Sequence, residues 1–226
     1  RPIPLSDSAG LTAAIEGMEV VYYADWRYQD WGAAEVADQP AMRGLRNVLA
    51  AASRARVSRL IYVSTTDVYG FPGEPVREGE LLAPPGLPYA DARAEAEIAV
   101  WEHARRVGLP VTVLRPATVY GPEAPEWVVD VVERLRQRRV VLIDEGAHVA
   151  GLTYVSNLVE ALVLAARAER AAGEAYNITD GSSVTWAEYF SGLAILAEVP
   201  PPRTSYSRAR ALAMVSLWER TYSLMG

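Results

Sequence analysis

Three short segments of the sequence have hydroxyl, phenol and cationic side chains at spacings that suit acid–base chemistry. Residues 62–70 (YVSTTDVYG) and 114–122 (LRPATVYGP) each end an apolar run, and residues 89–93 (YADAR) open a helical pattern. A hydroxyl on Thr65 and a phenol on Tyr89 could face one substrate oxygen. A phenol close to a cation has a lowered pKa and can act as a general acid or base. These segments predict an enzyme site.

Short apolar runs alternate with helical patterns along the chain, and this order predicts which elements position those segments. Strands are expected at residues 19–23, 59–64, 110–115 and 140–143, with helices at 40–54, 88–107 and 126–138 between them. Such alternation is typical of a mostly parallel sheet with helices on both faces. Ligands bind beyond the carboxyl ends of the strands in such sheets, so the three segments should meet there.

The second half of the chain has a different pattern. Short strands are expected at residues 152–155 and 175–179, with helices at residues 158–168 and 186–196. A stretch of three prolines leads into a final helix at residues 207–224. That helix has too many charged residues for a membrane anchor, so we expect it to dock on the protein or to form an oligomer such as a homodimer.

Composition excludes several kinds of chemistry. All 22 basic residues are Arg, there is no Cys, and His103 and His148 are the two histidines. Amine nucleophiles, thiol chemistry, disulfides and a histidine-rich metal site are therefore ruled out, and we expect no metal. A net charge of −6 argues against nucleic acid and anionic membranes as partners.

The apolar runs and the first residues give further expectations. No run approaches the roughly 18–20 apolar residues of a membrane span, so a cytoplasmic protein with a small-molecule substrate is expected. The chain starts with Arg1 and Pro2 rather than Met, which suggests that its natural N-terminus lies upstream.

The sequence resembles the extended short-chain dehydrogenase/reductases of the NAD-dependent epimerase/dehydratase type, most closely their 3β-hydroxysteroid dehydrogenase-like members. Besides the three segments above, residues 43–49 (RGLRNVL), 152–157 (LTYVSN) and 176–181 (YNITDG) match this group. The resemblance implies an α/β fold with a Rossmann-like, doubly wound, mostly parallel sheet. Residues 1–140 would form the Rossmann-like domain without its first βα unit. Residues 141–226 would form the last strands and a small substrate-capping lobe with the C-terminal helix.

The same resemblance implies roles for individual residues. The catalytic Ser/Thr, Tyr and Lys of the family fall on Thr65, Tyr89 and Arg93. The cofactor would be NAD or NADP. The residues implied to contact this cofactor are Arg93, Pro116 and Ser64. The residues implied to line the substrate pocket are Thr66, Tyr120, Arg115, Trp26 and Tyr28.

Several positions depart from the family pattern around the cofactor. No G-x-x-G-x-x-G loop occurs in the sequence, and the acidic residue that meets adenine in relatives falls near Pro4. A pair of small alanines in relatives falls on Ala24 and Asp25, followed by Trp26. An acid and an indole at these positions would crowd a dinucleotide and repel its phosphates.

Two further departures affect the proton-transfer residues. The Asn that often completes the proton relay in relatives falls on Ala41, and the Lys falls on Arg93. A guanidinium is bulkier than an ammonium and cannot lose its proton, although it could still hold a ribose and favour a tyrosinate. An alternative is that Arg93 is a surface residue paired with Glu97 one helical turn later.

Three hypotheses for function remain open from the sequence. The first is an NAD(P)-linked oxidoreductase or epimerase that acts on a hydroxyl or ketone of a small, partly apolar metabolite through Thr65 and Tyr89. The second is a non-redox cyclase, dehydratase or isomerase with an eroded cofactor site. The third is a non-catalytic binding subunit, because the fold alone cannot choose among these functions.

Overall fold

The computed structural model describes residues 2–25, 34–70 and 72–214. The chain forms two compact units. The first unit consists of Arg1–Ala117 and Ser156–Ile178, and the second of Thr118–Val155 and Thr179–Gly226. No helix in the described part of the chain is both long and apolar enough to cross a membrane.

The first unit is built on a four-stranded sheet in which every pairing is parallel. Its order is β1-β2-β3-β7. The strands are β1 (Val20–Tyr23), β2 (Arg59–Val63), β3 (Val111–Pro116) and β7 (Ala175–Ile178). All residues of the two central strands are buried, as expected for strands covered on both faces.

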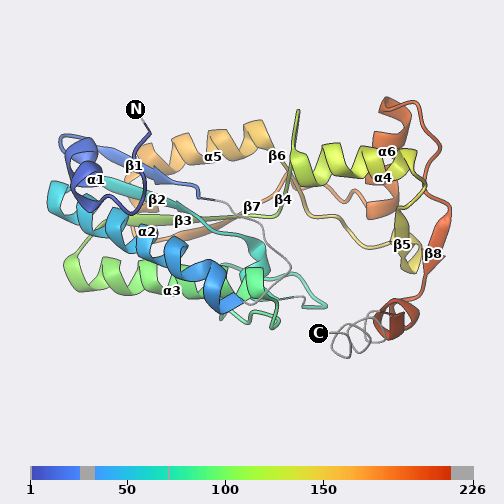
Figure 1. Ribbon diagram of the computed structural model, residues 1–226, viewed down its shortest axis with the longest axis horizontal. Helices are drawn as coiled ribbons and strands as arrows, with labels where there is room; N and C mark the ends of the chain where they lie inside the picture. The colour runs from blue at the N-terminus through green and yellow to red at the C-terminus, as the bar shows by residue number, and fades with distance from the viewer. Residues whose placement is uncertain (1, 26–33, 71, 215–226) are drawn as a thin grey trace. The chain divides into compact units, whose positions relative to one another are not determined.

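Helices cover both faces of this sheet. They are α1 (Ser8–Ile15), α2 (Ala34–Ala55), α3 (Pro88–Val107) and α5 (Val155–Arg167). The first three share one core with the sheet, including Leu49, Leu60 and Val100, whereas α5 packs on the other face against Ile61 and Leu114 (Figure 1). The doubly wound α/β sheet predicted from the sequence is confirmed.

The second unit holds two small parallel sheets and several short helices. Strand β4 (Thr118–Tyr120) pairs with β6 (Leu152–Tyr154), and β5 (Val141–Ile143) pairs with β8 (Thr204–Tyr206). The helices are α4 (Asp130–Arg136) and α6 (Trp186–Leu196), and residues 208–214 are also helical. A capping box between Thr185 and Glu188 fixes the start of α6.

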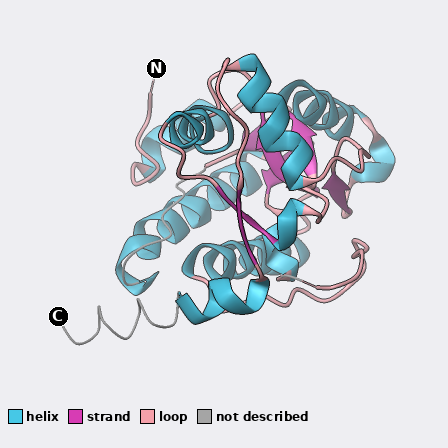
Figure 2. Cartoon of the chain, turned by 90° about the vertical axis from the view of Figure 1, so that its right-hand side faces the viewer, coloured by secondary structure: helices cyan, strands magenta, loops and turns pink. Residues whose placement is uncertain are grey.

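The remaining described elements are short helical turns. Helices make up more of the described chain than strands do (Figure 2). The 3₁₀ turns are Thr66–Tyr69, Asp144–Gly146 and Glu169–Ala171, and Pro125–Val129 is a π-helical turn.

Helix boundaries differ from the sequence-based prediction in two places. Helix α2 begins at Ala34 and contains Pro40, the residue at which the sequence-based prediction starts this helix. The helix expected over residues 126–138 is divided, because the amides of Val128 and Val129 both donate to the Ala124 carbonyl and widen the first turn.

Candidate active site

The end of β2 holds a buried hydroxyl in a defined orientation. Thr65 is 3% exposed, has an extended backbone and caps the 3₁₀ turn that follows it. Its Oγ1 accepts a hydrogen bond from the amide of Asp67 at 3.2 Å. Since this bond uses an acceptor site, the hydroxyl proton of Thr65 remains available, and it has no acceptor within the described ranges of the chain.

Helix α3 carries Tyr89, Arg93 and Glu97 on one face, because residues four apart are neighbours along a helix. Local sequence sets this helix: Pro88 occupies its first turn, and Gly108 ends it in the left-handed conformation with φ 71°. Tyr89 is buried in the first turn. The helix therefore presents a phenol, a guanidinium and a carboxylate in a fixed order.

Arg93 fastens the start of α3 to the ends of two strands. Its Nη1 donates to the Asp25 carbonyl oxygen at 3.1 Å, beyond β1, and its Nη2 donates to the Val63 carbonyl oxygen at 2.5 Å, at the end of β2. The guanidinium carbon also lies 5.5 Å from the centre of the Tyr62 ring, a cation–π geometry.

Two tyrosines lie beside this guanidinium. The rings of Tyr23 and Tyr62 stack with centroids 5.8 Å apart. Burial raises the pKa of both phenols, and the positive charge of Arg93 opposes the rise. The Tyr62 hydroxyl is buried and has no hydrogen-bond partner in the described part of the chain. The site thus contains an orphaned polar atom next to a fixed positive charge.

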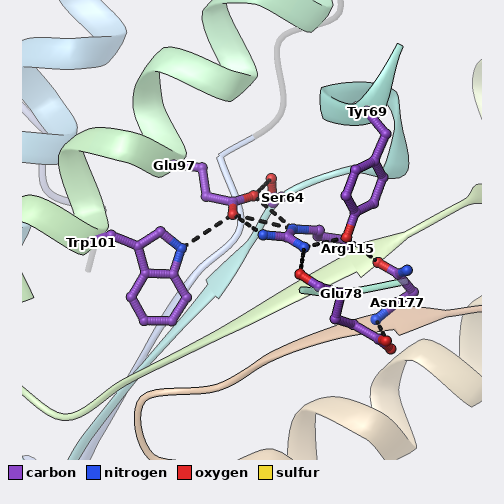
Figure 3. A network of polar contacts seen from close by, with 7 residues as sticks. All are labelled: Ser64, Tyr69, Glu78, Glu97, Trp101, Arg115 and Asn177. Atoms are coloured by element: carbon purple, nitrogen blue, oxygen red, sulfur yellow. Dashed lines mark hydrogen bonds and ion pairs between the residues drawn. The ribbon is translucent and has the colours of Figure 1, made fainter. Parts of the chain in front are cut away.

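A buried ion pair lies one turn further along α3 (Figure 3). Glu97 is 0% exposed, and its carboxylate accepts from Arg115 Nη2 at 2.5 Å and from Nε at 3.1 and 3.2 Å. It also accepts from the Ser64 hydroxyl at 2.6 Å and the Trp101 indole at 3.2 Å. Glu97 therefore pairs with Arg115 on β3 and not with Arg93. It also holds the side chain of Ser64, the residue before Thr65.

The other side of Arg115 continues the network to β7. Its Nη1 donates to the Tyr69 hydroxyl and to the Glu78 carbonyl oxygen. Tyr69 in turn donates to Asn177 Oδ1 at 3.0 Å (Figure 3). Burial tends to lower the pKa of Arg115, but the hydrogen bonds and charges of Glu97 and Tyr69 together outweigh burial, and the net change is upward. This network ties the turn after Thr65 to strands β3 and β7.

The first unit gathers most of the residues predicted for the site. Ser64, Thr65 and Thr66 lie at the end of β2, and Pro116 ends β3. Tyr89 and Arg93 lie on α3, and Arg115 lies on β3 with its guanidinium held in the network just described. Trp26 and Tyr28 lie outside the described residues.

Tyr120 belongs to the second unit, within an aromatic cluster. Its ring lies 5.3 Å from that of Tyr154 and 5.7 Å from that of Tyr189. Trp186 contacts Tyr189 at 6.1 Å and Trp127 at 5.3 Å between centroids. Burial and the carboxylate of Asp180 raise the pKa of Tyr120, and burial raises the pKa of Tyr189 to about 12.

Sequence reasoning missed the network roles of Tyr69 and Asn177 and the orphaned Tyr62 hydroxyl, and it considered Glu97 only as a surface partner of Arg93. Glu97 had a usable signal for a role at the site: it follows Tyr89 and Arg93 at intervals of four, on the same face of α3. Asn177 had none, because its contact depends on β7 lying next to β3.

Comparisons with known proteins agree with this architecture. Residues 3–179 match the model of the NAD dependent epimerase/dehydratase family. The chain is 29% identical over 230 residues to 2-alkyl-3-oxoalkanoate reductase of Stenotrophomonas maltophilia, covering 98% of this chain and 69% of that protein. It is 27% identical to 3beta-hydroxysteroid-dehydrogenase/decarboxylase isoform 1 of Arabidopsis thaliana, covering 98% of this chain and 54% of that protein.

Solved structures share the fold. The UDP-glucose 4-epimerase of Thermus thermophilus, solved with NAD, superposes with a TM-score of 0.73 at 26% identity, over 91% of this chain and 71% of that one. The dTDP-glucose 4,6-dehydratase of Streptomyces venezuelae gives a TM-score of 0.77 at 23% identity, over 91% and 66%. The Rossmann-like parallel sheet is therefore confirmed. With the family pattern matched over residues 3–179, the chain belongs to the NAD dependent epimerase/dehydratase family.

Proposed function

We propose that this chain supplies the catalytic residues of an NAD(P)-linked oxidoreductase or epimerase that acts on a hydroxyl or ketone of a small, partly apolar metabolite. The observation that carries this proposal is the orientation of Thr65. Its oxygen already accepts from Asp67, which leaves its proton for donation to a ligand. A buried donor of this kind suits a carbonyl or alkoxide oxygen.

Tyr89 moves the proton in this proposal. In reduction, the Tyr89 phenol donates its proton to the carbonyl oxygen of the substrate; in oxidation, the phenolate takes the proton back from the hydroxyl. Thr65 donates a hydrogen bond to the same oxygen in both directions. The contact from Arg93 to Val63 supports this pairing, because it fixes the turn of α3 after Tyr89 at the end of the strand that leads to Thr65.

The residues at these strand ends fit the nicotinamide and ribose end of a dinucleotide. Arg93 provides a fixed cation, Tyr62 provides a buried hydroxyl that has no hydrogen-bond partner among the described residues, and Pro116 lies at the neighbouring strand end. When bound, the nicotinamide supplies or accepts the hydride. Ser64 acts indirectly, because its hydroxyl is held by Glu97 and keeps the backbone before Thr65 in place.

One finding supports a partly apolar substrate with a ketone or hydroxyl. The bacterial relative named above is a reductase of 2-alkyl-3-oxoalkanoates, molecules with a ketone and alkyl chains.

One observation favours a second candidate, a non-redox enzyme that uses Thr65 and Tyr89 without a dinucleotide. Both terminal nitrogens of Arg93 already donate to backbone carbonyl oxygens. A guanidinium held by two backbone oxygens is less able to turn toward a ribose than the flexible Lys of the family would be.

Calorimetry with NAD(H) and NADP(H) on the full protein separates the two candidates. Saturable binding of either cofactor supports the first candidate, and absence of binding refutes it. With 2-alkyl-3-oxo acids as probes, Tyr89→Phe should lower kcat by about 10²- to 10⁴-fold, the usual worth of a general acid. Tyr22→Phe, an exposed phenol on β1, is the matched control and should leave kcat unchanged.

Thr65 is tested by a pair of variants. Thr65→Val removes the hydroxyl and should lower kcat strongly, whereas Thr65→Ser keeps the donor and should retain most of it. If Thr65→Val and Tyr89→Phe both turn over at the rate of the unaltered protein, neither residue has the role proposed.

A further inference from the structure

The second unit contains a small pocket of about 240 Å³ that the proposed reaction does not use. Pockets for drug-sized molecules have volumes of about 300–1,000 Å³, so this one suits a smaller ligand. Most of its lining is apolar and comes from the core around α4 and from the stretch before β8: Leu135, Val140, Pro200, Pro201 and Pro202. Every lining residue belongs to the second unit, so the pocket lies within one compact body.

The apolar wall of this pocket has a fixed shape. Leu135 is 2% exposed and packs with Ala194 of α6 in the core of the second unit. Each of the three prolines has its φ fixed by the ring and carries no backbone N–H. Such a wall needs little ordering when a ligand binds, and the prolines contribute no amide donors. Hydrogen-bond donors must therefore come from the other residues of the lining.

Two guanidinium groups provide those donors. Arg138 lies three residues before the start of β5, and Arg203 immediately precedes β8. The first residues of these two strands, Val141 and Thr204, are partners in a parallel pairing, so both arginines lie at the same edge of this small sheet. Both are exposed, and neither side chain forms an ion pair or a hydrogen bond with the described residues of the chain. Two cations at one pocket are therefore available to a ligand.

The polar groups of the pocket select an anion. No carboxylate is among the described residues that line it, and its one hydroxyl is that of Thr204. The acidic residue nearest in sequence on α4, Glu133, pairs with Arg136 and accepts from Gln137. A guanidinium binds a carboxylate through two parallel hydrogen bonds. Because a bare inorganic ion would leave the apolar wall in water, the lining favours an anion that carries an apolar chain.

We propose that this pocket binds a small carboxylic acid with an apolar chain. The carboxylate lies between Arg138 and Arg203 and accepts hydrogen bonds from both, and the chain lies against the apolar wall. The proposal is independent of the proposed enzymatic function, because the pocket shares no residue with the candidate active site.

Titration calorimetry of the full protein with acetate, butyrate and hexanoate tests both parts of the pocket. Each CH₂ that the wall removes from water should tighten Kd by about threefold to fourfold, so hexanoate should bind most tightly. Hexylamine and inorganic phosphate are the comparison ligands, and both should bind more weakly than hexanoate. Equal affinity for acetate and hexanoate would overturn the proposal, as would tighter binding of phosphate or no saturable binding of any carboxylate.

Variants locate the binding. Arg138→Gln and Arg203→Gln should each raise the Kd for hexanoate by more than about tenfold, because each removes a charge-assisted hydrogen bond. Arg139→Gln is the matched control: Arg139 is the exposed neighbour of Arg138 but does not line the pocket, and its Kd should stay within about threefold of that of the unaltered protein.

The methyl resonances of Leu135 and Val140, followed by NMR, should shift as hexanoate is added, because both side chains line the pocket. Hexanoate bound elsewhere, including at the candidate active site, would leave these resonances in place and would respond alike to all three Arg variants. Either result would overturn the proposal. Circular dichroism of each variant confirms that it is folded before it is compared.

Discussion

The Glu97 carboxylate makes the most consequential polar contacts in the first unit, and Glu97→Gln tests them. The carboxylate accepts from Arg115, Ser64 and Trp101 while fully buried. An amide has nearly the same shape but loses the charge and turns one acceptor into a donor. Arg115 would then stay buried as an uncompensated cation.

The size of the effect follows from that burial. Removing one partner of a buried ion pair costs about 3–5 kcal/mol, because the remaining charge cannot be solvated. For a chain of this length, each kcal/mol lowers Tm by about 2–4 °C. Glu97→Gln should therefore lower the Tm of the first unit by about 6–20 °C.

Thermal unfolding followed by circular dichroism measures this change, with urea unfolding as a second measurement of the free energy. The matched control is Glu95→Gln, because Glu95 lies on the same helix but is exposed. Exposed substitutions change stability by no more than about 0.5 kcal/mol. A Tm for Glu97→Gln that equals that of the control would refute the reasoning, because the ion pair would then contribute no net stability.

Three further perturbations have defined outcomes. Arg93→Met removes two hydrogen bonds from a charged donor and should lower the free energy of unfolding by about 3 kcal/mol in urea titrations. An unchanged urea midpoint would show that these two bonds do not hold α3 against the strand ends. Gly70→Ala places a Cβ 2.5 Å from the Ala83 carbonyl oxygen at a φ of 74° and should lower the free energy of unfolding by about 1–3 kcal/mol. An unchanged free energy in the same titration would count against this steric clash. Burial and the positive charge of Arg106 lower the pKa of His103 below 6.5, so the free energy of unfolding should be greatest above pH 6.5 and decrease as pH falls. His103→Gln should remove that dependence between pH 5 and 7. An identical pH profile for the variant would exclude His103 as the cause of the dependence.

Local signals in the sequence predicted some elements with their bounds. Pro88 and Gly108 mark the two ends of α3, and the structure places the helix at Pro88–Val107 as predicted. The apolar run before Ser64 predicted β2, because a strand covered on both faces needs apolar residues throughout. Such features depend on neighbours in the sequence, so the sequence alone reveals them.

The contacts around the site depend on residues far apart in the chain. Arg115 reaches Tyr69 across 46 positions, and Tyr69 reaches Asn177 across 108. Arg93 binds two backbone carbonyl oxygens, and a backbone acceptor leaves no trace in residue type. These partners become visible only when the order of the strands in the sheet is known.

The regular spacing on α3 also limits how the length of this chain can change. Tyr89, Arg93 and Glu97 share one face because a helix turns by about 100° for each residue. Inserting one residue after Tyr89 would rotate Arg93 away from its carbonyl oxygens and Glu97 away from Arg115 together. Insertions at residues 72–87, which form a loop rather than a helix, would leave that face intact. Proteins that keep this site should therefore differ in length in the loop and match residue for residue along the helix.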